Sequence, residues 1–464
     1  MLRYFTKHSI QIALGLVLTG LFVWLQTTGQ GAVRTLIGRL DYLAYDLRLN
    51  QTLPPAIETP RVFIIDIDEE SLRMEGRWPW SREKMGRLVA NLKANGVYAI
   101  GFDVAFAEPE RNVAQELIDA TASSEDAEFT EQLEQLIPDM DRDQAFAAYL
   151  KGQNVVLGFL FHASDDESVG KLPSGWSFVP PEQSDSLSVP TMTSYTGNLK
   201  VLQKSARHGG YLNTTPDSDG VIRATPLVLR HKSMIYPSLS LAMARRYLDA
   251  KRFKLETVDL EESIAVTGLR METMLIPTDR YGRVLVPYLG PRGRIPYIPA
   301  TRILQAGPED KFPELDNALV IVGTSAIGLG DLVSTPTDRA YPGVEVHATV
   351  LETILKRRPF PSVPDWADAA NVMVIAVCGV VLSLVSPALG ALGITLFTLL
   401  FLGALIGADI WLWSSAHLSL SPVVPVITVL AIITLNVLYG YFTEAQQKKQ
   451  VRKAFSSYMA PALV

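Results

Sequence analysis

The chain is poor in several patterns on which enzymes and secreted domains depend. Its 464 residues contain one cysteine, Cys378, so no disulfide can form within the chain and the polar part must be held by its own apolar core. There is no GK[ST] phosphate loop and no G-x-S-x-G element. No histidine shows the HExxH or paired spacing of a zinc site; the six are His8, His162, His208, His231, His347 and His417. Nothing within residues 1–464 therefore indicates a catalytic centre.

Charge is nearly absent from four long apolar stretches. The first, "SIQIALGLVLTGLFVWL", is long enough for one membrane span, and the C-terminal third contains about three more. We predict membrane helices at residues 9–27, 369–386, 388–413 and 420–442. Asp409 is the only charge of the third helix, and we expect it near the outer interface or facing a neighbouring helix.

The first apolar stretch has an alternative interpretation as a cleaved signal peptide. Arg3 and Lys7 precede it, and small residues follow it near residues 29–32. Against cleavage, the chain continues with apolar residues at helical spacing, namely Ile37, Leu40, Leu43 and Leu47. This favours an uncleaved anchor that runs into an amphipathic helix.

Four spans place both termini on one side of the membrane and residues 30–365 on the other. Basic residues directly after the last span favour a cytoplasmic C-terminus; they are Lys448, Lys449, Arg452 and Lys453. Three further basic residues at 356–358 oppose this, but large domains translocate largely regardless of charge. We expect a multi-pass protein of the inner (plasma) membrane, in contact with the lipid bilayer, with cytoplasmic segments at 1–8 and 443–464 and a periplasmic or extracellular domain at 30–365.

The segment 30–365 has the pattern of a mixed α/β domain. "VFIIDID" is a short buried strand, and "VYAIGFDVAF" is the next. Between them Ser81 is placed to cap a helix whose apolar stripe is Met85, Leu88, Val89 and Leu92. This is a βαβ unit, and "QNVVLGFLF" and "NALVIVGTS" add later strands. Residues 208–230 suggest a hairpin that turns at 217–220. We predict a parallel core with an antiparallel insertion.

Acidic residues are concentrated in one part of this domain. The net charge of −6 excludes no class of protein, but residues 110–150 contain eleven acidic residues and two arginines. We expect the segment 111–150 to be a solvated helical insertion, and we expect no nucleic-acid partner.

Aspartates lie where the predicted strands end. Asp66 and Asp68 share a face at the end of one strand, and Asp103 ends its neighbour. Asp331 follows a glycine-rich loop and is a candidate for the same edge. Ligands of open parallel sheets bind beyond the carboxyl ends of the strands, and divalent cations prefer oxygen ligands. These four are therefore candidates for ligand or metal binding, with the metal unknown; the alternative is that they cap helices and pair with nearby basic side chains.

Two tryptophans flank a proline close to this edge. Trp78 and Trp80, on either side of Pro79, form a rigid and bulky platform at the start of a helix. Such a platform closes the end of a core, or else lines a ligand pocket or a subunit contact. Both interpretations stay open at this point.

Several blocks of the chain resemble the CHASE2 extracellular sensor domain of bacterial receptors. They include "VFIIDIDEESLRMEGRWPWSREKMGRLVANLKANGVYAIGFDVAFAEPE", "GYLNTTPDSDGVIRATPLVL" and "LVIVGTSAIGLGDLVSTPTDRAYPGVEVHATVLETIL", in order across about residues 35–360. The resemblance implies one membrane helix before the sensor and three after it. It also implies an extracytoplasmic ligand or stimulus, which the sequence does not identify.

The resemblance also implies an output in the cytoplasm. "VRKAFSSYMAPALV" resembles the segment that precedes the catalytic domain of CHASE2-linked class III adenylate or guanylate cyclases, and Val451, Phe455 and Tyr458 follow a coiled-coil-like spacing typical of a signal relay. A cyclase domain that uses Mg²⁺ or Mn²⁺ is then expected beyond Val464, and the protein is expected to form a homodimer. No cofactor is expected within residues 1–464. The alternatives are a histidine or Ser/Thr kinase output, a metal-dependent membrane enzyme using Asp66, Asp68 and Asp103, and a structural partner subunit.

Overall fold

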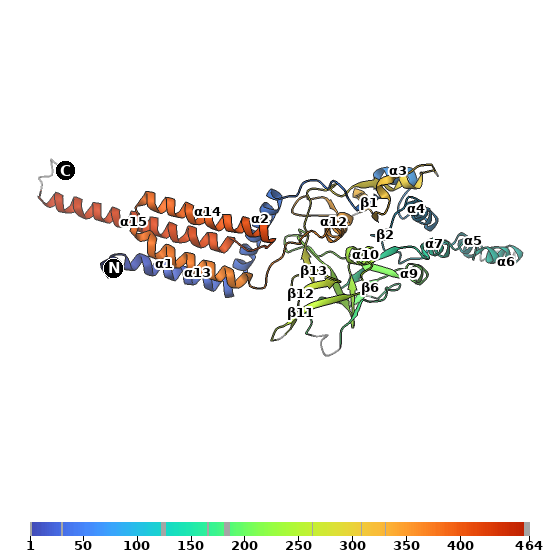
Figure 1. The fold of residues 1–464 in the computed structure, drawn as a ribbon, viewed down its shortest axis with the longest axis horizontal. Helices are drawn as coiled ribbons and strands as arrows, with labels where there is room; N and C mark the ends of the chain where they lie inside the picture. The colour runs from blue at the N-terminus through green and yellow to red at the C-terminus, as the bar shows by residue number, and fades with distance from the viewer. Residues whose placement is uncertain are drawn as a thin grey trace. The chain divides into compact units, whose positions relative to one another are not determined.

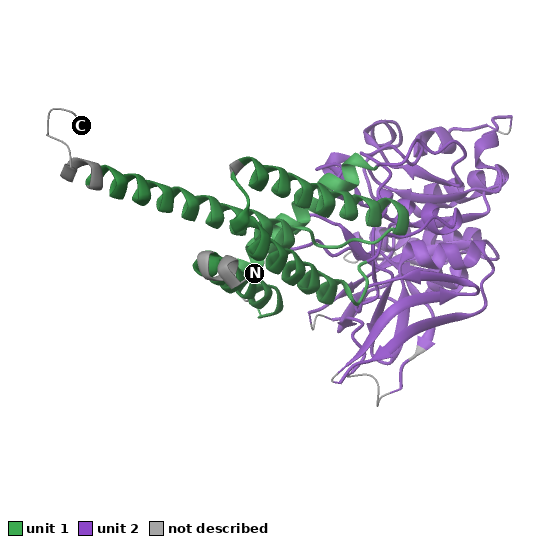
Figure 2. Cartoon of the chain, turned by 60° about the vertical axis from the view of Figure 1, so that its left-hand side comes forward, with its two compact units in different colours: residues 1–52, 363–464 green, residues 53–362 purple. Residues whose placement is uncertain are grey.

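A computed structural model describes residues 2–28, 31–121, 127–164, 167–180, 186–261, 263–307, 309–329 and 331–458. The chain forms two compact units (Figure 2). Residues 1–52 and 363–464 make a helical unit, and residues 53–362 make an α/β unit. Parallel and antiparallel sheets together with four long apolar helices confirm the predicted fold class.

The α/β unit is built on a seven-stranded sheet in the order β15-β1-β16-β2-β3-β6, with β7 also paired to β3. All its pairings are parallel except that of β3 with β6. Its strands are β1 (Val62–Asp66), β2 (Ala99–Phe102), β3 (Val155–His162), β6 (Ser194–Thr196), β7 (His208–Tyr211), β15 (Tyr297–Pro299) and β16 (Leu319–Gly323). Every residue of β1, β2 and β16 is buried, as expected for parallel strands covered on both faces.

Helices cover the two faces of this sheet. Ile100 and Phe102 of β2 face a core that contains residues of α4, α7, α9 and α11, whereas Gly101 between them lies against Met243 of α10 on the opposite face. On that opposite face Gly323 of β16 lies against Val344 of α12. The helices of this unit are α3 (Glu69–Glu75), α4 (Arg82–Ala94), α5 (Val113–Ala120), α6 (Ala127–Leu136), α7 (Arg142–Leu150), α9 (Lys200–Ala206), α10 (Leu239–Tyr247), α11 (Ala300–Leu304) and α12 (Gly343–Leu355), with 3-10 turns at Pro313–Leu315 and Ile327–Leu329.

Helix α4 confirms the predicted cap and stripe of the βαβ unit, whose parallel strands β1 and β2 lie on either side of β16. The Ser81 hydroxyl accepts a hydrogen bond from the Lys84 N–H at 3.3 Å, and the helix ends at Ala94 with Asn95 as its C-cap. The predicted stripe is entirely buried in the main core; it consists of Met85, Leu88, Val89 and Leu92.

The predicted antiparallel strands are present, but the predicted hairpin of residues 208–230 is wrong. Residues 217–220 do form a turn, in which the Gly220 N–H donates to the Asp217 carbonyl at 2.9 Å. The flanking segments, however, pair with other strands: β7 joins the parallel core beside β3, and β8 pairs with β14. The remaining strands are β4 (Ser177–Phe178), β5 (Thr191–Met192), β8 (Ala224–Pro226), β9 (Val228–His231), β10 (Met234–Pro237), β11 (Phe253–Asp259), β12 (Ile264–Met271), β13 (Met274–Pro277), β14 (Arg283–Leu285), β17 (Leu332–Val333) and β18 (Tyr341–Pro342).

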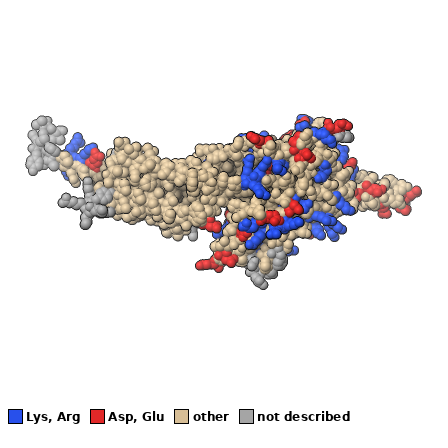
Figure 3. All heavy atoms as spheres, in the orientation of Figure 1, with Lys and Arg blue, Asp and Glu red and all other residues tan. Residues whose placement is uncertain are grey.

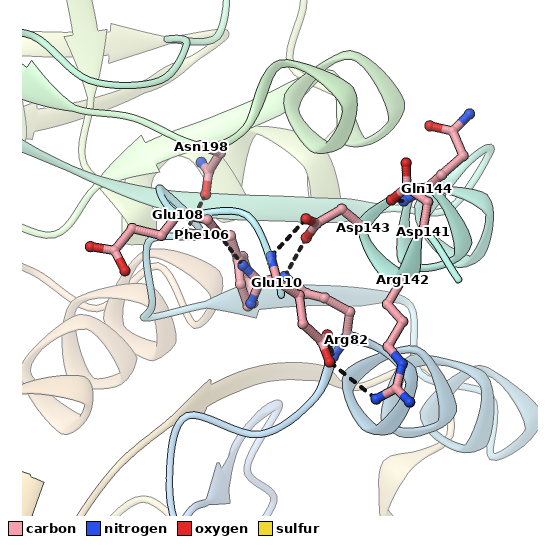
Figure 4. Close-up of polar contacts among 9 residues, drawn as sticks. All are labelled: Arg82, Phe106, Glu108, Glu110, Asp141, Arg142, Asp143, Gln144 and Asn198. Carbon is pink, nitrogen blue, oxygen red and sulfur yellow. Dashed lines mark hydrogen bonds and ion pairs between the residues drawn. The ribbon is translucent and has the colours of Figure 1, made fainter. Parts of the chain in front are cut away.

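The acidic segment 111–150 is solvated only in part. Phe146 and Leu150 of α7 are fully buried in the main core, so this helix is part of the domain and not of an appendage. Figure 4 shows what fixes it: the Arg82 guanidinium donates to the Asp143 carboxylate at 2.7 Å, and the same carboxylate accepts the Glu110 N–H at 2.8 Å. The negative charge of Asp143 is offset by Arg82 in this buried ion pair. The number of acidic residues alone therefore gave a wrong prediction for this helix.

The helical unit contains α1 (Leu2–Thr28), α2 (Ala32–Gln51), α13 (Ala367–Val385), a 3-10 turn at Ser386–Ala388, α14 (Ala391–Ala416) and α15 (Val423–Tyr458). Four of its helices are long and apolar enough to cross a membrane, at His8–Thr28, Ala367–Ala388, Leu392–Ala416 and Val423–Lys453, which confirms the four predicted spans. They run side by side in Figure 1, and Figure 3 shows almost no charged side chains on their surface until the end of α15.

Helices α1 and α13 approach closely through two glycines. A Cβ at Gly15 would lie 2.4 Å from the Ser383 hydroxyl, and a Cβ at Gly379 would lie 2.3 Å from Thr19. Each glycine thus accommodates a small polar side chain of the other helix. Such small-residue contacts are typical of helix packing in membranes.

Helix α2 belongs to the helical unit, and the compact α/β unit starts at Leu53. The reason is a buried polar cluster. Arg48 of α2 pairs with Asp409 of α14, donates to the Ser419 hydroxyl at 2.8 Å, and lies 4.7 Å from the centre of the Trp413 ring. The one charge of the third span therefore faces a neighbouring helix, which was one of its two predicted environments.

Candidate functional site

A pocket of about 320 Å³ lies at the carboxyl edge of the central sheet. Its wall combines residues that follow β1, β2 and β16 with residues of α12, and a volume of this size is suited to a small ligand. The lining residues are Ile67, Trp78, Asp103, Val104, Ala105, Leu160, Leu212, Thr214, Thr324, Leu329, Asp331, Gly343 and His347. The topology thus places a pocket where open parallel sheets bind ligands.

Two of the predicted aspartates meet in this pocket. Burial raises the pKa of Asp103 to about 7. Burial, and after it the charge of Asp103, also raises the pKa of Asp331 to about 7. Two like charges in one partly dry pocket cannot both ionise without cost, so near neutral pH the pair retains a proton or attracts a cation.

Asp331 also has a structural role at the start of α12. Its carboxylate accepts a hydrogen bond from the Val344 N–H, which opposes the rise of its pKa, and its carbonyl accepts the Gly343 N–H at 2.8 Å. A Cβ at Gly343 would lie 2.6 Å from an Asp331 carboxylate oxygen, so a larger residue at this position would displace that carboxylate. Any change in the charge of Asp331 is therefore felt directly at the first turn of α12.

His347 lines the pocket, although its spacing in the sequence indicated no site. It is only 2% exposed, and its Nε2 donates to the Leu212 carbonyl at 3.3 Å. Burial lowers its pKa, while the charge of Asp331 and this hydrogen bond oppose that effect. A neutral ring that donates from Nε2 carries no proton on Nδ1, so His347 offers the pocket an acceptor beside two acidic groups.

Asp66 and Asp68 have other partners. Asp66 ends β1, and its carboxylate accepts from the N–H and the hydroxyl of Ser325, at 2.9 and 2.6 Å. Burial raises its pKa to about 6 against these hydrogen bonds. Asp68 caps α3 by accepting the Ser71 N–H at 2.7 Å. Asp68 thus has the helix-capping role given as the alternative, and Asp66 fixes the loop that follows β16.

The carboxylates do not assemble into a metal centre in the part of the chain that the structure describes. No group of three or more histidine, cysteine, aspartate or glutamate side chains there is arranged to hold a metal ion. Asp66 and Asp68 are engaged as above, and Asp103 shares its pocket with Asp331 instead. The predicted set of Asp66, Asp68 and Asp103 is therefore divided between two structural roles and one pocket.

The two tryptophans divide the roles proposed for their platform. Trp80 is 4% exposed and belongs to the main core, where its indole N–H donates to the Gly76 carbonyl at 2.9 Å. Trp78 lines the pocket, and the two rings meet edge to face with centres 5.8 Å apart. Trp80 therefore closes the core, and Trp78 supplies an aromatic wall to the pocket.

Two buried glutamates hold α12 in place, and sequence reasoning missed both. The Glu345 carboxylate accepts from the N–H groups of residues 293–295 at 3.0–3.2 Å and from the Tyr297 hydroxyl at 2.7 Å. Two helical turns later, the Glu352 carboxylate accepts from the N–H groups of Arg61 and Val62 at 3.1 and 3.0 Å. Acidic residues seven apart in an otherwise apolar helix lie on one face, and that spacing was the available signal.

The predicted relay residues lie on α15. This helix continues without interruption from Val423 to Tyr458, beyond the predicted end of the span at residue 442. Val451 is exposed, and the side chains of Phe455 and Tyr458 lie outside the described residues. Their role in signal relay stays a prediction.

These features define a membrane protein with an α/β unit that contains a ligand-sized pocket at the edge of a parallel sheet. The family model of the CHASE2 domain matches residues 16–381, which is more than half of the chain. The chain therefore belongs to the CHASE2 family, whose domain is an extracellular sensor of signalling proteins. No curated protein and no solved structure matches it.

Proposed function

We propose that this chain is the sensing and membrane-spanning part of a bacterial receptor that controls a class III adenylate cyclase making cAMP. In this proposal the α/β unit lies in the periplasm, both termini lie in the cytoplasm, and the receptor works as a homodimer because cyclases of this class form their active sites between two chains. Even span number and the basic residues after the last span support the orientation.

One observation carries the proposal: the chain runs from α12, which lines the pocket, through a short connection into the second apolar helix. Gly343 and His347 of α12 line the pocket, and after Leu355 the chain continues through residues 356–366 into α13, the second span. A ligand that neutralises the Asp103 and Asp331 pair changes the charge at the first turn of α12. Its binding energy can thereby favour one position of α12, and of the span that follows, over another.

The test joins a class III cyclase catalytic domain after Val464 and measures cAMP in bacteria that lack their own cyclase. Asp103→Asn and Asp331→Asn imitate a neutralised pocket, and we expect each to change cAMP output about fivefold or more relative to the unaltered chain. Glu314→Gln, which removes an exposed carboxylate of the same unit, is the matched control and should leave output unchanged. Equal output from all four chains, at equal membrane levels, would refute the pocket as the input.

The same chain joined to a histidine kinase core separates the two output classes. A response with the cyclase domain and none with the kinase core supports cyclase control, and the reverse supports a kinase receptor. Cysteine labelling checks the orientation: cysteines placed at Arg77 and at Lys449 should react from opposite sides of the membrane, and labelling from one side contradicts the proposal.

A further inference from the structure

The α/β unit contains a second pocket, of about 540 Å³, whose wall is strongly basic. It is distinct from the carboxyl-edge pocket, and the two share no lining residue. Four cationic side chains line it, together with His208 and Trp176, against a single carboxylate, that of Asp249. The four cations are Arg207, Arg245, Arg246 and Lys251.

The cations converge from separate segments of the chain. Arg207 follows α9 and has φ of 63°, which directs the chain into β7 at His208. Arg245 and Arg246 occupy the last turn of α10, and Lys251 lies between that helix and β11. Basic residues in a last helical turn are stabilised by the helix dipole, which accounts for Arg245 and Arg246 alone. It does not explain why Arg207 and Lys251 lie at the same pocket.

The charges of this pocket are not neutralised within the described part of the chain. None of the four cations there forms an ion pair within 4.0 Å of a carboxylate. Asp249 is exposed, and Glu272 binds the backbone N–H of Lys251 at 2.7 Å. The pocket thus has an excess of positive charge, which attracts anions.

The two arginines of α10 are held in fixed orientations. The Arg245 guanidinium lies 4.4 Å from the centre of the Trp176 ring, and its Nε donates to the Ala250 carbonyl at 3.0 Å. Arg246 donates from Nη2 to the Asn154 side chain at 2.8 Å, and its buried Nε has no partner among the described residues. Both guanidinium groups therefore retain donors while their planes are fixed, which is the arrangement suited to an oxyanion.

The electrostatic effects of the arginines meet at His208. Burial lowers the pKa of His208 first, and the charges of Arg246, Arg245 and Arg207 lower it further, in that order. Burial and then the charge of Arg246 also lower the pKa of Arg245. An anion between these side chains would remove the unfavourable interactions in both cases.

We propose that this pocket binds a small organic anion, with its carboxylate or phosphate group held by Arg245 and Arg246. Arg207 and Lys251 supply the surrounding positive charge, and Trp176 contributes the apolar wall. The volume falls within the range of small-molecule sites. This site is separate from the input pocket of the proposed function, so either can fail without the other.

The test is calorimetry of the full chain in a neutral detergent, at constant ionic strength, with phenyl phosphate, benzoate and inorganic phosphate as separate probes. We expect at least one probe to bind, and Arg245→Gln and Arg246→Gln each to weaken it about tenfold or more. Arg87→Gln, which removes an exposed arginine of α4, is the matched control and should bind as the unaltered chain does. Absence of binding by all three probes, or equal binding by all variants, would overturn the proposal.

A second readout needs no arginine variant. NMR titration of His208, identified by comparison with His208→Gln, should show its pKa rising when the binding probe is added. A bound anion offsets the field of the arginines, so the protonated imidazole becomes less costly. Binding without any shift of His208 would place the probe elsewhere and would also overturn the proposal. If the phosphate probes bind and benzoate fails to bind, the ligand is a phosphate compound.

Discussion

A buried ion pair of the helical unit and a pair of carboxyl groups in the α/β unit show two opposite ways of treating buried charge. In the helical unit the Arg48 guanidinium meets the Asp409 carboxylate, and both are shielded by neighbouring side chains. In the α/β unit Asp103 and Asp331 place two like charges in one pocket. A buried charge with an opposite partner stabilises the folded unit that contains it. Two like charges without such a partner are stabilised only when a proton, a cation or a ligand binds to them. The difference separates a contact that holds the helical unit together from a pocket whose charge state depends on what binds there.

The largest predicted effect comes from breaking the pair in the helical unit. Arg48→Ala leaves the Asp409 carboxylate buried without a partner, and we expect a loss of about 3 kcal/mol or more of unfolding free energy. Thermal unfolding of the full chain in detergent, followed by circular dichroism, measures it. The double variant Arg48→Gln with Asp409→Asn removes both charges and should recover most of the loss. A single variant as stable as the unaltered chain would contradict the pairing.

The buried pair of the α/β unit should respond next most strongly. Arg82→Gln leaves the Asp143 carboxylate unpaired beside the main core and removes the cation that lies 4.8 Å from the centre of the Phe106 ring. We expect a loss of about 2–3 kcal/mol, measured by denaturant unfolding. Arg142→Gln breaks a more exposed ion pair, with Glu110, and should cost at most about 0.5 kcal/mol. Equal losses from the two variants would mean that burial does not decide the effect.

Neutralising a carboxyl group of the like-charged pocket should raise the stability of the protein, whereas breaking an ion pair lowers it. Because the folded-state pKa of Asp331 is raised to about 7 from 3.8, the folded protein holds a proton that the unfolded chain releases. Its contribution to stability is therefore complete below pH 3.8 and is lost as the pH rises through 7. Asp331→Asn should raise stability at pH 8 by about 1 kcal/mol, or about 2–4 °C, and by less at pH 5, where only part of the contribution has been lost.

Melting curves of both chains at the two pH values check this prediction. Asp103→Asn should behave in the same way, because each carboxyl raises the cost of ionising the other. Destabilisation by Asp331→Asn at pH 8 would show that the capping of α12 by Asp331 outweighs the repulsion.

The smallest effect concerns the aspartate that the structure assigns to capping. Asp68→Ala removes the acceptor for the Ser71 N–H at the start of α3, and we expect a loss of about 0.5–1 kcal/mol. Glu70→Gln, an exposed change in the same turn, should alter stability by a few tenths of a kcal/mol at most. A loss several times larger for Asp68→Ala would indicate a role beyond the cap.

Local patterns predicted much of the fold. The cap at Ser81 and the stripe of α4 were visible because both depend on residues a few positions apart. The pairing of residues 208–230 was not predictable in the same way, because β7 joins a strand about fifty residues earlier and a turn signal does not reveal which strands pair. Helix α7 was hidden because the carboxylate of Asp143 is neutralised by Arg82, an arginine from another helix.

The candidate site was predictable in outline. Strand ends indicated the correct edge, and Asp103 and Asp331 do meet there. The separation of Asp66 and Asp68 depends on where β1 ends: beyond Asp66 the strand alternation no longer applies, so Asp68 turns to cap a helix. His347 lies sixteen positions after Asp331 on a helix that returns to the same edge, and only the folded chain shows this proximity.

The glycine contacts between α1 and α13 restrict how these two helices can move relative to each other. Gly15 accommodates Ser383 and Gly379 accommodates Thr19, so two contacts together favour the observed register of the pair. Sliding α13 lengthwise would press both hydroxyl-bearing side chains against neighbours that have a Cβ. A lengthwise shift of α13 alone is thereby opposed. In the proposed relay, α1 and α13 would therefore move together.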